Sequence, residues 1–153
     1  YVEYEGAIDI IGDKGDEGAK EAIKNGEFFF SWSEERKVHV EYDINSLVTF
    51  EPPYDKSYCK NRCMRVYDTF GDNVKKGFPP NKYDNYGDGW DAAEGDGKAL
   101  LLETQRRGAI KNVDTAEDFK VDRELSSNDE MYIIAGLDAT DSGEKTYVTV
   151  GTR

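Results

Sequence analysis

The sequence has few of the side chains that most often carry out catalysis. It contains one histidine, two cysteines and four prolines in 153 residues. The only histidine, His39, lies between Val38 and Val40, and strand-like alternation places it on the opposite face from both valines, toward solvent. No serine or cysteine has a recognisable nucleophile context around it. The sequence therefore predicts a protein that is not an enzyme.

Long apolar runs and an excess of basic residues are also missing. The densest apolar cluster, Phe28-Phe29-Phe30, falls far short of the ~18–20 residues of a membrane span, so no membrane insertion is predicted. The net charge is −12, which disfavours nucleic acid as a partner because a phosphate backbone needs a basic patch. The same charge favours a cationic partner or divalent cations.

The two cysteines, Cys59 and Cys63, have the spacing C-x3-C. The simpler interpretation is a disulfide that closes a tight loop, and this favours an extracellular protein. The alternative is a pair of reduced thiols in a metal site. Zinc takes about four ligands, so such a site would need Asp or Glu partners beside the thiolates, since His39 is the only histidine.

Short stretches rich in β-branched and aromatic residues recur along the chain and predict strands. They lie at Val2–Glu5, Ala7–Ile11, Phe28–Trp32, Lys37–Tyr42, Leu47–Phe50, Arg62–Tyr67, Leu100–Leu102, Ala109–Val113, Phe119–Val121, Met131–Ala135 and Thr146–Val150. At most one short helix is predicted, from Glu17 to Asn25, with Gly26 as its C-cap. Residues 71–97 are acidic and rich in glycine, and are predicted to form a long ordered loop. The sequence therefore predicts an all-β fold, a single β-sandwich or jelly-roll-like domain over residues 1–153.

A short motif occurs twice, and it is the most informative feature of the sequence. The segment Tyr67-Asp68-Thr69-Phe70-Gly71-Asp72 is followed by Tyr83-Asp84-Asn85-Tyr86-Gly87-Asp88, so both copies read Tyr-Asp-x-aromatic-Gly-Asp. Two copies of one motif predict one loop geometry that is used twice. In each copy two carboxylates are four residues apart, and a tight curl at glycine would bring them together.

The second copy predicts a calcium site, because calcium binds carboxylate, amide and carbonyl oxygens. Its predicted ligands are Asp84, Asn85, Asp88, Asp91, Glu94 and Asp96. The first copy, with Asp68 and Asp72, is followed by two lysines and is predicted to be an auxiliary loop. Tyr86 and Trp90 lie beside the predicted ion and are candidates for stacking on a sugar ring. The alternative is that Asp, Asn and Gly serve here only as turn residues.

Two stretches, Cys63–Asp72 and, more closely, Tyr83–Trp90, resemble the Asp-Ser-Tyr-Gly-Asp-Gly-Trp/Ile loop of secreted β-sandwich modules. The resemblance covers roughly residues 59–103. It implies an extracellular, adhesive, matrix-facing or carbohydrate-facing role with cation-stabilised loops. The chain departs from that pattern in two ways. The first copy reads Gly-Asp-Asn, and the Cys-Cys pair often seen just after the loop is missing.

Together these features predict a non-enzymatic, extracellular, calcium-stabilised β-module that binds carbohydrate or a matrix component. A first alternative is a structural subunit of an extracellular filament or appendage, whose copies join by pairing the terminal strands Tyr1–Ile11 and Thr146–Val150. A second alternative is a small glycoside hydrolase that uses two carboxylates, with Glu94 and Asp96 as nominal candidates.

Overall fold

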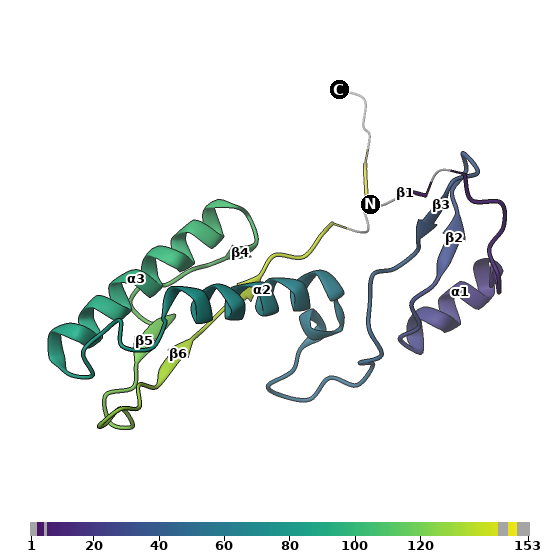
Figure 1. Ribbon diagram of the computed structural model, residues 1–153. Helices are drawn as coiled ribbons and strands as arrows, with labels where there is room; N and C mark the ends of the chain where they lie inside the picture. The colour runs from purple at the N-terminus through teal and green to yellow at the C-terminus, as the bar shows by residue number, and fades with distance from the viewer. Residues whose placement is uncertain (1–2, 5, 144–146, 150–153) are drawn as a thin grey trace. The chain divides into compact units, whose positions relative to one another are not determined.

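The structure of the protein, a computed structural model, describes residues 3–4, 6–143 and 147–149 (Figure 1). Its elements follow in the order β1 (Glu3–Tyr4), α1 (Gly15–Lys24), β2 (Phe30–Trp32), β3 (Val38–Val40), the 3-10 helix η1 (Lys56–Cys59), α2 (Asn61–Gly77), α3 (Gly87–Arg106), β4 (Ile110–Lys111), β5 (Phe119–Val121), β6 (Ile133–Ala135) and β7 (Asp138–Ala139). The chain divides into two compact units, residues 1–68 and 69–153, and the division falls within α2. The single domain predicted over residues 1–153 stays a prediction.

The first unit contains a three-stranded antiparallel sheet with the order β1-β3-β2. Across this sheet Glu3 is opposite His39, and His39 is opposite Ser31. On the central strand β3, Val38 is buried, and Phe29 is buried just before β2. The sheet therefore contributes apolar side chains to the core of this unit. It also carries a row of polar residues that lie opposite one another on neighbouring strands.

Helix α1 forms because its small and apolar residues recur at helical spacing. Ala19, Ala22 and Ile23 share one face, and Ala22 is buried. The helix ends before Gly26, which has a φ of 70°. A Cβ atom at this glycine would lie 2.8 Å from the backbone oxygen of Asn45, so only glycine fits.

Helix α2 follows η1, whose start is capped by Asp55. The side chain of Asp55 accepts a hydrogen bond from the backbone N–H of Ser57 at 2.8 Å. Along α2 each apolar residue is three or four positions from another one, which is the spacing typical of an amphipathic helix. These residues are Cys63, Val66, Tyr67, Phe70 and Val74. Cys63 and Phe70 are buried, so the stripe faces protein interior.

The second unit is built around the contact between α3 and β5. β5 pairs antiparallel with β6, and β4 pairs antiparallel with β7. The buried face of α3 presents Ala93, Gly97 and Leu101, each four residues from the next. Phe119 of β5 is fully buried, and its ring stacks on Phe78 with centroids 5.5 Å apart. Small residues on α3 therefore make room for a large aromatic core residue on the strand.

Several predicted elements are confirmed. The predicted strand Phe119–Val121 is β5, and the predicted short helix is α1, displaced by one or two residues. The strands predicted at 2–5, 28–32, 37–42, 109–113 and 131–135 contain β1, β2, β3, β4 and β6. These are short elements, and the local preference of β-branched and aromatic residues was enough to find them.

The predicted all-β fold with at most one short helix is wrong, because α2 and α3 occupy residues that were interpreted as strand and loop. The predicted strand Arg62–Tyr67 lies within α2, and Leu100–Leu102 lies within α3. The predicted loop 71–97 holds the end of α2 and half of α3. Leu47–Phe50 forms no strand. Of the last predicted strand, residues 146 and 150 lie outside the described residues.

Candidate functional site

The two copies of the repeated motif have different conformations, so the prediction of one shared loop geometry is wrong. The first copy, Tyr67–Asp72, lies entirely within α2, where Asp68 and Asp72 are about one helical turn apart. The second copy, Tyr83–Asp88, covers the end of the connection between α2 and α3 and the first residues of α3. The same residue pattern therefore lies within a helix in one place and at the start of a helix in the other.

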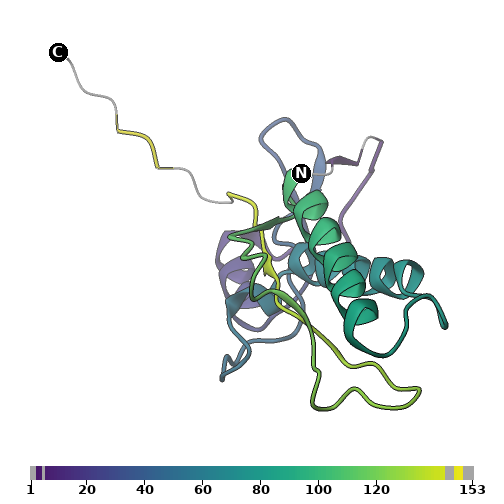
Figure 2. The same cartoon turned by 90° about the vertical axis from the view of Figure 1, so that its left-hand side faces the viewer.

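The second copy is organised by the side chain of Asn85. Its oxygen Oδ1 accepts a hydrogen bond from Trp90 Nε1 at 2.8 Å. Its nitrogen Nδ2 donates to the backbone oxygens of Asn128 at 3.0 Å and Glu130 at 2.8 Å. Asn85 therefore holds the start of α3 against the connection between β5 and β6, and the two segments lie side by side in both Figure 1 and Figure 2.

Two aromatic rings lie close together at this place, that of Tyr86 exposed and that of Trp90 half-buried. The ring centroids of Tyr86 and Trp90 are 5.9 Å apart, and Tyr86 is 80% exposed. The guanidinium of Arg123 lies 5.9 Å from the Trp90 ring and forms an ion pair with Asp91 at 2.6 Å. The side chain of Asp91 is therefore held beside the aromatic pair. That Tyr86 and Trp90 bind a ligand stays a prediction.

Glu94 lies at the contact between α3 and β5 and is mostly buried. Its Oε1 accepts a hydrogen bond from the backbone N–H of Val121 at 3.1 Å and lies 3.5 Å from Arg123. Its Oε2 lies 3.6 Å from Lys98. This carboxylate therefore joins the helix to the strand through one backbone bond and two basic groups.

Asp96 has a different set of partners at the other side of α3. Its Oδ2 accepts hydrogen bonds from Lys82 Nζ at 2.8 Å and from the Tyr83 hydroxyl at 2.6 Å. The bond from Lys82, followed by that from Tyr83, lowers the pKa of Asp96. Residues two apart on a helix point in different directions, so Glu94 and Asp96 do not face one another as a hydrolytic pair would.

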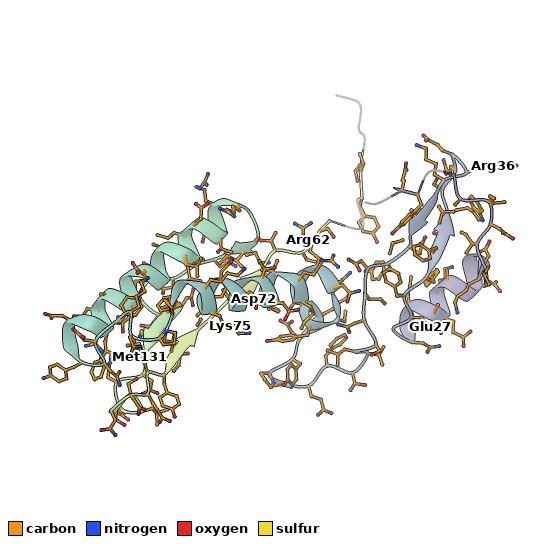
Figure 3. All side chains as sticks on the ribbon, in the orientation of Figure 1. Glu27, Arg36, Arg62, Asp72, Lys75 and Met131 are labelled. Atoms are coloured by element: carbon orange, nitrogen blue, oxygen red, sulfur yellow. The ribbon has the colours of Figure 1, made fainter. Side chains whose placement is uncertain are left out.

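The predicted calcium ligands do not gather around one point. In the part of the chain that the structure describes, no group of three or more His, Cys, Asp or Glu residues is placed to hold a metal ion. The helical path of α3 spreads Asp88, Asp91 and the later acidic residues around its axis. On α2, Asp72 pairs with Lys75 at 3.6 Å. Figure 3 labels both residues on this helix. Calcium itself stays a prediction.

The predicted disulfide between Cys59 and Cys63 is wrong, since no disulfide occurs among the described residues. Both side chains are buried, Cys63 completely. The thiol of Cys59 donates a hydrogen bond to the backbone oxygen of Lys56 at 3.1 Å. The two thiols lie at the end of η1 and the start of α2, where they contribute to the core as small apolar side chains.

A polar cluster on β2 and β3 was not predicted. His39 Nε2 lies 3.2 Å from the hydroxyl of Ser31 and 3.3 Å from Oε2 of Glu41, and the Ser31 hydroxyl also donates to Glu41. The His39 side chain is only 13% exposed, so its predicted solvent-facing position is wrong. A serine triad needs the acid at the ring nitrogen opposite the serine. Here both groups contact Nε2, which is not that arrangement. Ser31 and His39 meet because the register of β2 and β3 places them opposite one another. The sequence alone does not reveal this register, so it could not predict the cluster.

Comparison with known proteins identifies the family. Residues 54–153 match the family described as the phage tail sheath C-terminal domain. The chain belongs to this family. The matched region includes α2, α3 and the whole second unit, and it contains the segments predicted as strand and as calcium-binding loop.

Relatives of known sequence and structure agree with this family. The phage-like element PBSX protein XkdK of Bacillus subtilis is 31% identical over 98% of this chain and 34% of its own length. Sheath tail proteins of Desulfitobacterium hafniense and Listeria innocua have TM-scores of 0.79 and 0.76, at 32% and 29% identity. Each alignment covers 98% of this chain, and 35% and 36% of those chains.

A chain from the 6-fold symmetrised cryo-EM structure of the anti-feeding prophage baseplate has a TM-score of 0.77 at 16% identity, over 99% of this chain and 43% of that one. At this identity the likeness concerns the fold alone. The chain spans about a third of the length of the curated relatives it matches.

Family membership overturns the resemblance to secreted β-sandwich modules, and with it the description of the chain as an adhesive or carbohydrate-binding module. The short Tyr-Asp-x-aromatic-Gly-Asp motif lies within a helix in its first copy and at the start of a helix in its second. The alternative of a structural filament or appendage subunit fits the family better. An extracellular location stays a prediction. No helix among the described residues is long and apolar enough to cross a membrane.

Proposed function

We propose that the protein is a structural subunit of a tail-sheath-like assembly and that copies of it join to one another. The relatives from Listeria innocua and Desulfitobacterium hafniense are sheath tail proteins, which supports a structural role. The proposal therefore includes no enzymatic activity. It does include the filament-subunit alternative that the sequence suggested.

The observation that carries the proposal is the exposure of apolar side chains near both ends of the chain. Ile8 and Ile11, before α1, are 97% and 102% exposed. Tyr147 and Val148 are 90% and 75% exposed. Exposing several large apolar side chains to water costs free energy. Burial of these side chains against a neighbouring copy removes that cost.

The sheet of the first unit offers a way for neighbours to join. In its order β1-β3-β2, the strands β1 and β2 are the edges among the described residues. An edge strand leaves backbone N–H and C=O groups that an extended segment of another copy can pair with. The terminal segment 1–11 supplies β1 here, so the same part of the chain combines an edge strand with exposed apolar residues.

Sedimentation velocity of the purified protein over a range of concentrations tests this proposal. We expect species much larger than one chain. The double variant Ile8→Lys and Ile11→Lys should shift the distribution toward the monomer. The matched control, Val48→Lys and Leu102→Lys, changes two apolar residues of about half exposure and should assemble like the unchanged protein. A protein that remains monomeric at every concentration would contradict the proposal.

A further inference from the structure

One surface of the second unit combines the exposed ring of Tyr86 and the half-buried ring of Trp90 with uncompensated negative charge. We call it the acidic aromatic patch, and it consists of Asp84, Tyr86, Asp88, Trp90, Asp129 and Glu130. Asn85 accepts a hydrogen bond from Trp90 and donates to the backbone of residues 128 and 130, and these bonds bring the two segments of the patch together. The patch therefore joins two acidic segments, and the aromatic pair belongs to the first of them.

The charge of this patch is not neutralised within the described residues. Asp84, Asp88, Asp129 and Glu130 form no ion pair there, whereas the neighbouring Asp91 is paired with Arg123. No cluster of carboxylates among these described residues is arranged for a metal ion either. The exposed face of Tyr86 next to several carboxylates suits a guanidinium or ammonium group, which is attracted by both.

The first unit carries the opposite charge over a short segment. Residues 55–65 contain four basic side chains and one acidic side chain, in a chain of net charge −12. These are Lys56, Lys60, Arg62, Arg65 and Asp55. Lys60 is buried against the Tyr42 ring, so Lys56, Arg62 and Arg65 are the basic side chains at the surface. The carboxylate of Asp55 accepts hydrogen bonds from Ser57 and keeps its negative charge, and Arg65 is paired with Asp43 at 2.6 Å. Lys56 and Arg62 are exposed and form no ion pair among the described residues. Figure 3 labels Arg62 on α2.

From these two surfaces we propose that the acidic aromatic patch of one copy docks on the basic segment 55–65 of a second copy. The inference rests on the proposed function, and it names the surfaces that meet. Two different surfaces make the contact heterologous, so a docked pair still has one free patch on one copy and one free basic segment on the other, as a ring or filament requires. Because two chains of charge −12 repel overall, local complementarity determines the orientation in which they meet.

A charge-swap experiment tests the contact. The variant Lys56→Glu with Arg62→Glu makes the basic segment acidic, and Asp84→Lys with Asp129→Lys makes the patch more basic. We expect each variant alone to associate at least about tenfold more weakly than the unchanged protein. A mixture of the two variants should associate again, because every acidic surface then meets a basic one. Recovery on mixing also shows that both variants are folded.

The control variant Lys20→Glu with Lys24→Glu makes the same change in net charge on exposed residues of α1 and should associate like the unchanged protein. Sedimentation velocity at about 0.05 M and 0.5 M NaCl gives the second readout, since the contact should weaken as salt screens it. If the unchanged protein assembles and both swapped variants assemble equally well, the docking inference is wrong and the proposed function stands. If the unchanged protein does not assemble at either salt concentration, both are wrong.

Discussion

Gly97 of α3 lies directly against the ring of Phe119 of β5. A Cβ atom at position 97 would stand 2.1 Å from two atoms of that ring, which is far inside van der Waals contact. Both residues are buried, and Phe119 has no exposed surface. The absence of a side chain on Gly97 therefore sets the distance between helix and strand in the second unit. Gly95, on the same helix, has no described atom within 4 Å of the corresponding position.

The substitution Gly97→Ala should destabilise the protein. The added methyl group forces Phe119 out of its position, and overpacking of this kind costs about 1–3 kcal/mol. The control Gly95→Ala places a methyl group in open space and should raise the free energy of unfolding by about 0.5–1 kcal/mol, because alanine favours the helix more than glycine. Urea unfolding of both variants gives the comparison. Equal stability of the two variants would show that the contact does not constrain α3.

The glycines of α3 also explain why the sequence did not reveal this helix. Glycine lowers helix propensity, and six of the residues from 71 to 97 that were read as loop are glycines placed on α2 or α3. The acidic residues and glycines between 84 and 97 are typical of turns when taken locally. In the folded chain, Ala93, Gly97 and Leu101 lie on one buried face, and packing against Phe119 outweighs the propensity.

For α2 the helical signal was present but was interpreted as a strand. Cys63, Tyr67, Phe70 and Val74 follow the period of 3.6, while the run Arg62–Tyr67 by itself looks like a half-exposed strand. The strands of the first unit were found from local preferences, but the pairing of Ser31 with His39 depends on register. Strand register joins positions that are apart in the sequence, and so do the contacts of Asn85 with residues 128 and 130. A single sequence does not show which distant positions come into contact.

The pH dependence of stability should include a contribution from Glu103. Its carboxylate accepts hydrogen bonds from Arg106 at 2.7 Å and from Arg107 at 2.8 Å, and these lower its pKa from 4.5 to about 2. The folded-state pKa lies below the unfolded value, so the stabilisation is complete above pH 4.5 and is lost as the pH falls toward 2. We expect the variant Glu103→Gln to lose less stability than the unchanged protein over this interval.

Titration of the Glu103 carboxyl by NMR checks the cause directly. The variant Arg106→Gln should raise the pKa of Glu103 toward 4.5, since Arg106 makes the largest contribution to lowering it. The control Lys120→Gln removes a basic residue that pairs with Glu117 and should leave the Glu103 titration unchanged. An unchanged pKa in the Arg106 variant would contradict the assignment.

Cys59 and Cys63 should behave as buried thiols. A thiol-specific reagent should react slowly with the native protein, because the two side chains are 6% and 0% exposed. In denaturant without a reducing agent it should modify both cysteines of each chain. A disulfide would leave no reactive thiol under these conditions, so the measurement separates the structure from the disulfide that the spacing C-x3-C suggested.

Removal of divalent cations should leave the melting temperature unchanged. Asp91, Glu94 and Asp96 already have basic partners in Arg123, Lys98 and Lys82, and the described residues include no cluster suited to a metal ion. Thermal melts with and without a chelator make the comparison. A fall in melting temperature that added calcium reverses, and that Asp84→Asn with Asp88→Asn abolishes, would support the calcium ligands predicted from the sequence instead.

The substitution Asn85→Ala should loosen the start of α3 and destabilise the second unit by about 1–3 kcal/mol. It removes the acceptor for Trp90 Nε1 and the donors to two backbone oxygens in the connection between β5 and β6. The fluorescence of Trp90 should change with the loss of its hydrogen bond, whereas Trp32 in the first unit should not respond. The control Asn73→Ala removes an amide on α2 for which no side-chain hydrogen bond occurs among the described residues, and it should neither lower the stability nor change the fluorescence. If Asn85→Ala matches this control, the amide does not hold the two segments together, and the acidic aromatic patch has no fixed geometry.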